Sequence, residues 1–370
     1  MNKGTKIIEF CPVPPPYGGV TVFVKRLSDK LRSDGLIVGG YYTSDCDNQD
    51  VKNLAHYYEI PPYAGGSVVS RAYNQIKRMF NNWLQICPFD VVHYHGLENL
   101  KFLWFLYRYC SKKVVITVHS AMIENFYRQT DRINKHYMRQ LAGADIQWIA
   151  VSQQAKDCML RLPFSFKNEI LVVPAYVPIE TPDTPLPDDM LSYINSHKKN
   201  IAFYGRSFML NNGLDVYGFE PTLRMYADVI KANRDDIGLV FCLSEDKEKD
   251  KIAKLHQLAK SLKIDDKVYW QIGAINNINC LWKSIDVYVR PTSTDGDSVA
   301  VREVLDQGVQ VVASDVCWRP DNVISYHFGD QQDFVKKVLL ALSVNRREAV
   351  PNFSCYNDMK SIFIRVLNKQ

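Results

Sequence analysis

A segment near residue 300 places acidic side chains at the expected start of a short helix. Asp295 and Asp297 flank a glycine, and Glu303 follows Asp295 after a gap of seven residues. Ser298 or Asp297 can cap this helix, because both side chains accept hydrogen bonds from free backbone N–H groups. Free N–H groups at a helix start also attract phosphate. The segment therefore predicts an anion site beside carboxylates, and the residues expected to face the anion are Gly296, Asp297, Ser298 and Val299.

Glycines follow three further expected strands. Gly18 and Gly19 precede a helical pattern, Gly273 and Ala274 end a later strand, and a glycine precedes Arg206. Because glycine has no Cβ, a backbone can approach a ligand closely there. The planar fork of an arginine suits bidentate contact with phosphate. The pair at 18 and 19 lacks the GxGxxG spacing of dinucleotide binders, which weakens a dehydrogenase interpretation, and a plain tight turn is the alternative.

Three histidines lie at the ends of two expected strands in the first half. His93 and His95 are two apart on an extended chain, so they point the same way and could in principle hold a metal;. No third ligand has recognisable spacing, so a structural or substrate-binding role is preferred. His119 ends the next strand, and a satisfied, half-buried histidine is the alternative to a role in binding.

Apolar runs typical of strands alternate with helical patterns along the whole chain. The expected strands are 6–11, 36–42, 91–94, 114–118, 148–151, 170–173, 200–204, 237–243, 268–272, 285–289 and 309–313. Expected helices include 20–31, 221–232, 249–262, 358–367 and one that Gly308 ends;. This alternation predicts an α/β fold of parallel sheets covered on both faces. A proline-rich stretch near residue 182 predicts a connector between domains 1–182 and 183–352.

The acidic segment and its surroundings resemble the donor site of retaining glycosyltransferases of family 4. The pattern is an acid, seven residues, then a glutamate, followed by small residues and a glycine before a valine-rich strand. The resemblance covers nearly the whole chain and implies the GT-B fold, with two Rossmann-like doubly wound domains facing a cleft. It also implies that a C-terminal helix, within 353–370, crosses back to the N-terminal domain.

The resemblance implies a role for each candidate residue. A nucleotide diphosphate would lie on the helix start, with Glu303 on the ribose hydroxyls, Asp295 on the transferred sugar and Arg206 on the diphosphate. His119 would lie against the transferred sugar and Gly18 and Gly19 near the donor phosphates and the acceptor, whereas Gly273 and Ala274 would hold the nucleobase.

Two departures from the family pattern stand out. The family usually has Glu first and Phe third in the acidic loop, where this chain has Asp295 and Asp297. The family also pairs the arginine with a lysine, and the matching position here is Asn212, which supplies no charge. That loss forgoes up to about 4 kcal/mol at ~4 Å in a dielectric near 20. Either Arg290 or Arg302 supplies the missing charge, or activity is low.

Composition and charge restrict the setting. Hydrophobic content of 46% and charged content of 23% are typical of a globular protein;. Nine cysteines without a CxxC pair favour neither a disulfide framework nor a zinc ribbon;. With no cleavable targeting segment evident, we expect a cytoplasmic protein. The net charge is +5, with the surplus of basic residues in 1–180. Together with aromatic stripes at 71–84 and 102–107, this surplus suggests peripheral contact with the inner face of a membrane, although such stripes are more often core.

The expected function is transfer of a hexose or N-acetylhexosamine from a nucleotide-diphosphate sugar, with UDP as the expected nucleotide. The acceptor would be a saccharide or lipid-linked molecule in bacterial surface polysaccharide synthesis. No cofactor, no metal and no nucleic-acid partner are expected. The alternatives are a nucleotide-sugar epimerase on the same fold and a degenerate transferase that binds nucleotide without turnover. A further alternative is that Asp295 and Asp297 are turn acids without function, and the Asp-x-Asp metal site of GT-A transferases is the weaker option.

Overall fold

The computed structural model divides the chain into two compact units. Unit 1 comprises Met1–Val177 with Phe353–Gln370, and unit 2 comprises Pro178–Asn352. The last helix of the chain therefore belongs to unit 1. The structure describes residues 5–11, 18–43, 57–60, 83–97, 100–180, 185–232, 236–275 and 278–368.

Unit 1 is built on a parallel seven-stranded sheet in the order β3-β2-β1-β4-β5-β6-β7. The strands are β1 (Lys6–Phe10), β2 (Ile37–Thr43), β3 (Tyr57–Ile60), β4 (Val91–Tyr94), β5 (Lys113–Val118), β6 (Gln147–Ala150) and β7 (Leu171–Val172). The helices are α1 (Gly19–Ser33), α4 (Leu100–Tyr109), α5 (Ile123–Gln129), α6 (Arg132–Ala142), α7 (Gln153–Leu160) and α14 (Ser354–Asn368).

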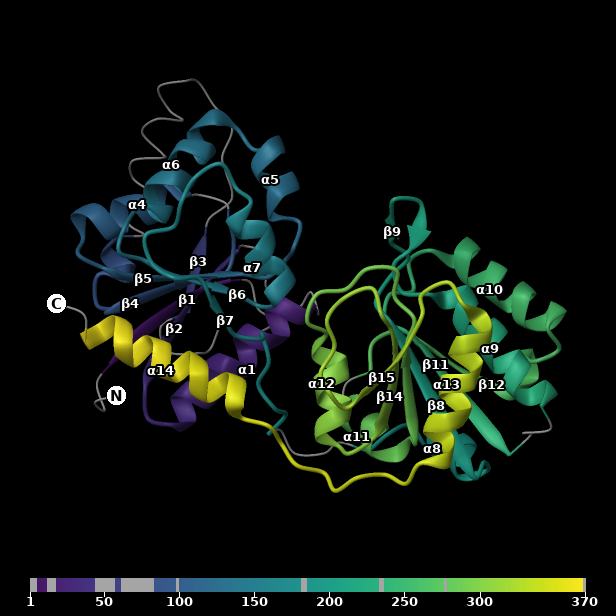
Figure 1. Ribbon diagram of the computed structural model, residues 1–370. Coiled ribbons are helices and arrows are strands. Elements are labelled where there is room, and N and C mark those ends of the chain that lie inside the picture. Colours follow the sequence, from purple (N-terminus) through teal and green to yellow (C-terminus); the bar gives the residue numbers. More distant parts are fainter. Residues whose placement is uncertain are drawn as a thin grey trace. The chain divides into compact units, whose positions relative to one another are not determined.

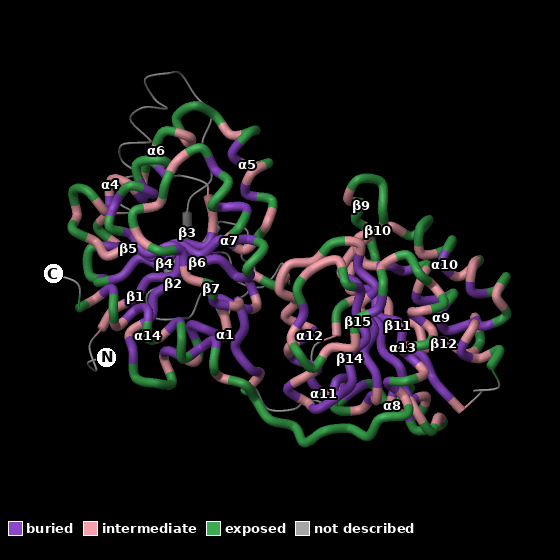
Figure 2. The backbone as a smooth tube through the Cα atoms, viewed as in Figure 1, coloured by how far each residue is buried: buried purple, intermediate pink, exposed green. Residues whose placement is uncertain are grey.

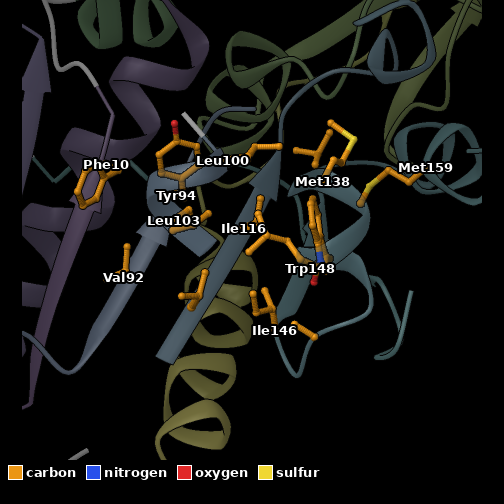
Figure 3. Close-up of a cluster of buried hydrophobic side chains, with 14 of the residues drawn as sticks. Phe10, Val92, Tyr94, Leu100, Leu103, Ile116, Met138, Ile146, Trp148 and Met159 are labelled. Carbon is orange, nitrogen blue, oxygen red and sulfur yellow. The ribbon is translucent and has the colours of Figure 1, made fainter. Parts of the chain in front are cut away.

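Alternating side chains of this sheet enter two separate cores. One face packs against α4, α6 and α7, and Figure 3 shows its side chains, among them Val92, Ile116, Trp148 and Met138. The opposite face is covered by α1 and α14, which lie side by side in Figure 1. In α14, buried residues recur at helical spacing, so one stripe of this helix closes the sheet;. The residues of α14 that enter this core are Tyr356, Met359, Ile362, Phe363 and Val366.

Unit 2 contains a second parallel sheet, of six strands, in the order β12-β11-β8-β13-β14-β15. Its strands are β8 (Lys199–Gly205), β11 (Ile237–Leu243), β12 (Val268–Ile272), β13 (Val287–Arg290), β14 (Gln310–Ser314) and β15 (Val323–Tyr326), and a small hairpin adds β9 (Leu210–Asn211) and β10 (Leu214–Asp215). The helices are α8 (Asp188–Asn195), α9 (Phe219–Lys231), α10 (Lys249–Ser261), α11 (Ile278–Ser284), α12 (Val299–Asp306) and α13 (Gln331–Ser343), with a 3₁₀ turn at Asp265–Lys267.

Helices cover both faces of the second sheet as well. The helices α9, α10 and α13 pack on one face, and α8, α11 and α12 pack on the other. Figure 2 shows the result in both units, where buried strands lie between helices that are buried on one side only. Each unit is thus a doubly wound α/β layer structure, as the alternation of strands and helices predicts.

Most expected strands form within one or two residues of their predicted bounds, but three strand features were missed. The short strands β3 and β15 were not predicted. In the hairpin, Asn212 and Gly213 both have positive φ angles, 50° and 79°. Asn-Gly favours such a two-residue turn. Asn212 is exposed and forms the turn of this hairpin. The sequence had been interpreted only as lacking the family lysine at that position.

The aromatic stripe at 102–107 belongs to the core of unit 1. The helix α4, which holds the stripe at 102–107, buries Leu103 and Leu106 and packs the neighbouring aromatic rings against the core of unit 1. Most of the other stripe, 71–82, lies outside the described residues. No helix among the described parts of the chain has the length and apolar character needed to cross a membrane.

Candidate active site

The predicted site residues gather where the strand order of each sheet reverses. From β8, the chain adds β11 and β12 on one side and then β13 on the other, and from β1 it adds β2 and β3 before β4. Open α/β sheets bind ligands at the carboxyl ends of strands beside such switch points. Arg206 follows β8 directly, and the acidic loop follows β13. In unit 1, His95 follows β4 and His119 follows β5.

The acidic loop leads into α12 with the predicted cap. Ser298 is the N-cap, and its side-chain oxygen accepts a hydrogen bond from the backbone N–H of Val301. Gly308, with a φ of 72°, follows the helix end. The first N–H groups of any helix have no intrahelical acceptor. The N–H groups of Val299 and Ala300 are therefore available to an anion at this edge of the sheet.

Asp295 is held by two arginines. Arg290, at the end of β13, donates from Nε to Asp295 Oδ2 at 3.0 Å, and Arg319 donates to the same oxygen at 2.8 Å. The other carboxylate oxygen accepts from Arg290 and from the backbone of Gly296. Burial raises the pKa of Asp295, but the two guanidinium groups outweigh that effect, so its pKa is lowered. Asp295 is an ionised, fully bonded carboxylate, and contact with a sugar would require exchange of one of these donors.

Asp297 and Arg302 form a second buried pair. The Nε of Arg302 lies 2.8 Å from both carboxylate oxygens, and the two side chains are 4% and 11% exposed. Burial is the main reason that the pKa of Asp297 is raised, and Arg302 opposes it. Both arginines that the sequence analysis considered as a replacement for the family lysine are therefore already bonded to buried carboxylates.

Glu303 points into the core of unit 2. Its Oε2 accepts a hydrogen bond of 2.9 Å from the indole N–H of the fully buried Trp282 in α11, and Glu303 is only 5% exposed. The indole thus fixes the carboxylate orientation. The predicted contact of Glu303 with ribose stays a prediction.

Arg206 differs from the other arginines in its exposure. Its Nε donates to Glu245 at 3.1 Å, and the two side chains are 38% and 34% exposed. Exposed ion pairs contribute little to stability, so Arg206 can exchange this partner for a phosphate at small cost. Gly273 and Ala274 follow β12, the edge strand of the same sheet; Gly273 has a φ of 107° and Ala274 is exposed.

In unit 1, Gly18 and Gly19 form the start of α1. The backbone N–H of Gly18 donates to the hydroxyl of Thr21, which donates back to the Gly18 carbonyl, each at 3.0 Å. The preceding residues, 12–17, lie outside the described part of the chain. The side chain of Thr21 therefore fixes the start of α1.

The three histidines join a carboxylate that sequence reasoning missed. Glu9 lies in β1, opposite His93 of β4, and is fully buried. Its Oε2 lies 2.9 Å from Nδ1 of His93 and 2.7 Å from Nε2 of His95. The other ring nitrogen of His95 lies 2.9 Å from Nε2 of His119. A carboxylate between the apolar residues Ile8 and Phe10 of an expected strand was the available signal.

Among the described residues, Glu9, His93 and His95 are a group that could hold a metal, because their ligand atoms lie within 4.8 Å of one another. However, both imidazole nitrogens converge on one carboxylate oxygen at ordinary hydrogen-bond distances. A tetrahedral ion with bonds of about 2.0–2.2 Å needs its ligand atoms further apart than that. The contact of His95 is a hydrogen bond to the carboxylate, and both distances are shorter than a tetrahedral ion requires between its ligand atoms;.

A cavity of about 420 Å³ lies next to the histidines. Polar side chains and apolar side chains both line it, and it is bordered by His95, His119, Ser120, Asn125, Phe126 and Gln129. A mixed lining of this kind suits a ligand with both hydroxyl groups and C–H faces.

Sequence reasoning also missed Arg319, Glu245 and Trp282. Arg319 and Glu245 lie in loops after β14 and β11, at the same sheet edge as the predicted residues. That placement was the usable signal, because such loops supply ligand contacts in α/β folds. Nothing in the sequence indicates that the indole of Trp282 meets Glu303.

Comparison with known proteins supports the resemblance. Residues 17–180 match the family model Glycosyltransferase Family 4. The fold resembles that of a glycosyltransferase from Rickettsia africae, with a TM-score of 0.71 and 14% sequence identity. The match covers 99% of this chain and 100% of the Rickettsia chain.

Sucrose-phosphate synthase from Thermosynechococcus elongatus gives a TM-score of 0.68 at 15% identity, covering 98% of this chain and 99% of that one. HepE from Anabaena, in complex with UDP, gives a TM-score of 0.67 at 13% identity, and the match covers 98% of this chain and 96% of HepE. No curated protein matches in sequence. The family match over residues 17–180 and the GT-B fold shared by the whole chain together support a glycosyltransferase.

Proposed function

We propose that this glycosyltransferase uses a UDP-sugar and moves a hexose or N-acetylhexosamine, with retention of configuration, to a saccharide or lipid-linked acceptor. The observation that carries the proposal is the start of α12, whose loop follows β13, next to β8, the strand that Arg206 follows at the switch point of unit 2. A helix start and an exchangeable arginine are the groups that a diphosphate needs. That HepE was solved with UDP supports the choice of nucleotide.

The chemistry follows from how charge develops on the leaving diphosphate. The N–H groups of Val299 and Ala300 and the guanidinium of Arg206 would stabilise that charge as the bond to the sugar breaks. Arg302 is paired with Asp297, and Arg290 shares Asp295 with Arg319, so both Arg290 and Arg302 hold the loop rigid through buried carboxylates. The cluster of Arg290, Arg319 and Asp295 keeps one net positive charge near the helix start. Backbone dipoles and Arg206 would then act without a metal.

Thermal stabilisation by UDP, GDP, ADP and their sugar conjugates, with and without EDTA, tests this proposal. A ligand at 100 times its Kd adds about 2.7 kcal/mol to the free energy of unfolding. We expect a shift with the UDP series that survives EDTA. The absence of a shift with every nucleotide would refute the proposed donor site. A shift that EDTA abolishes would refute the metal-independent mechanism.

Two substitutions assign the site. Glu303→Ala should weaken binding of the UDP-sugar, whereas His119→Ala should preserve binding and lower turnover. Asp306→Ala is the matched control, because it removes another buried carboxylate from the same helix and leaves Glu303 with its partner Trp282. If Asp306→Ala weakens binding as much as Glu303→Ala does, the effect comes from the packing of α12 and not from a ribose contact.

The proposed acceptor and its place at a membrane are inferred from the distribution of charge along the chain. Residues 1–180 hold the surplus of basic side chains, which suits an anionic lipid-linked acceptor at the inner face of a membrane and a role in bacterial surface polysaccharide synthesis. Sedimentation with vesicles that contain anionic lipid, compared with neutral vesicles, tests the contact. Equal sedimentation with both would argue against it.

A further inference from the structure

A row of polar groups interrupts the apolar face of the first sheet. Along β1, β4 and β5, the residues Ile7, Val91 and Val115 enter the core beneath α1 and α14. Two positions further along the same strands stand Glu9, His93 and Thr117, all buried. Rings of Phe23 and Phe363 pack against the histidines. An ionised carboxylate in such surroundings is costly unless every donor near it is used.

The row divides into two branches at Glu9. In one branch, Nδ1 of His93 lies 2.9 Å from Oε2 of Glu9 but without hydrogen-bond geometry, and Nε2 of His93 is hydrogen-bonded to the hydroxyl of Thr117 at 2.8 Å. In the other, His95 bonds to Glu9 through Nε2 and to His119 through Nδ1, at 2.7 and 2.9 Å. The first branch ends inside the core, whereas the second ends at the cavity that His119 lines.

The positions of the protons follow from this geometry. Glu9 as a carboxylate can only accept, so Nε2 of His95 must carry a proton. A neutral His95 then has a lone pair on Nδ1, so Nε2 of His119 must be the donor between them. In a neutral His119, this leaves Nδ1 without a proton. Among the described residues, no partner is found for that nitrogen.

The pKa shifts agree with these protonation states. Burial raises the pKa of Glu9, but His93 and His95 outweigh it and lower the pKa to about 2. Burial is the main cause that lowers the pKa of His95 to about 4, and burial likewise lowers that of His119. At neutral pH the branch therefore contains one carboxylate and two neutral imidazoles.

We propose that Glu9 is a positioning residue: through His95 it holds His119 in the tautomer whose Nδ1 accepts a hydrogen bond from a ligand hydroxyl in the cavity. The identification of that hydroxyl as part of a sugar rests on the proposed function, and the tautomer does not. A fixed acceptor distinguishes a hydroxyl from a deoxy or O-methyl group, because only the hydroxyl donates a proton. Glu9 thus sets specificity without touching the ligand.

The test is the ring 13C and 15N spectrum of histidine in the full chain, which contains 8 histidines. Wild-type His119 should carry its proton on Nε2 alone. His95→Phe removes the acceptor for that proton and keeps a ring of similar volume, so His119 should become a mixture of tautomers. Glu9→Gln should have the same effect, because an amide no longer fixes the proton of His95.

His93→Phe is the matched control, since it changes an equally buried ring on the other branch of the same carboxylate. It should leave the tautomer of His119 unchanged. In turnover assays, His95→Phe should lower kcat by up to about tenfold, the effect of one hydrogen bond, and should reduce the preference for the hydroxyl over the O-methyl analogue.

Several results would overturn the proposal. One is wild-type His119 with a proton on Nδ1, a result that needs no variant to fold. Another is an equal change of tautomer in His93→Phe and His95→Phe. A Zn²⁺ complex of the wild type, lost in both variants, would make the cluster a metal centre instead. The proposed tautomer with no turnover of any nucleotide sugar would refute the function and leave the positioning role intact.

Discussion

Replacement of Arg319 by methionine should destabilise unit 2 by about 3 kcal/mol. The Arg319 side chain is 5% exposed and donates to Asp295, Thr292 and the Ser314 carbonyl at 2.8–3.2 Å. Removal of one partner from a buried ion pair costs about 3–5 kcal/mol, because a charge is left without compensation. Asp295 keeps Arg290, which places the expected loss at the lower end of that range.

Urea unfolding would measure the change, and hydrogen exchange of β13 and β14 would assign it to unit 2. Arg224→Met is the control, because the Arg224–Glu220 pair is 51% and 65% exposed. Exposed pairs contribute about 0–1 kcal/mol. If Arg319→Met loses no more stability than Arg224→Met, the two-arginine clamp on Asp295 does not hold the loop.

The pH dependence gives a second check on the same variant. The folded state lowers the pKa of Asp295, so the ion pairs stabilise the protein above the unfolded pKa of about 3.9. Their contribution is lost as the pH falls through the lower, folded pKa. The stability difference between wild type and Arg319→Met should therefore be complete at neutral pH and shrink only in acid. A difference that grows as the pH falls would contradict this assignment.

Two further predictions concern a glycine and a helix contact. Gly218→Ala should lower the free energy of unfolding by more than the ~1–2 kcal/mol of a left-handed φ, because a Cβ there would clash with the Pro291 carbonyl oxygen. Gly35→Ala is the control: its φ is similar but the space around it is open, so it should lose only the conformational part. Equal losses of the two variants in urea unfolding would refute the clash. Asp34→Asn should weaken α14 by up to about 1 kcal/mol, since the hydrogen bond from Lys360 is the main cause of the lowered pKa of Asp34. Hydrogen exchange of α14 should rise at neutral pH, where the carboxylate is ionised, and the effect should vanish in acid; unchanged exchange at neutral pH would contradict it.

The sequence allowed prediction of the elements because local signals and burial agree there. In α12, Ser298 caps the start and Gly308 follows the end. Strands buried on both faces appear as apolar runs, so their positions follow from composition alone. The position of the acidic loop after a strand also placed Asp295 and Asp297 correctly at the edge of a sheet.

The partners of these residues were beyond prediction, because they come from distant segments. Glu9 meets His95 across 86 positions, and Asp295 meets Arg319 across 24. Which donor a buried carboxylate selects depends on strand order, which the chain pattern does not specify. The family resemblance assigns Asp295 to a ligand, whereas the geometry shows that protein donors already use both of its oxygens.

The place of α14 has a consequence for synthesis of the chain. The helix closes a core of unit 1, yet it follows the whole of unit 2 in the sequence. At about 5–20 residues per second, a ribosome needs roughly 9–35 s to add the intervening 178–352 segment. During that interval the apolar face meant for Tyr356 and Phe363 stays only partly covered, by α1. A nascent chain stalled in unit 2 would therefore expose this face, which makes it a natural binding surface for chaperones.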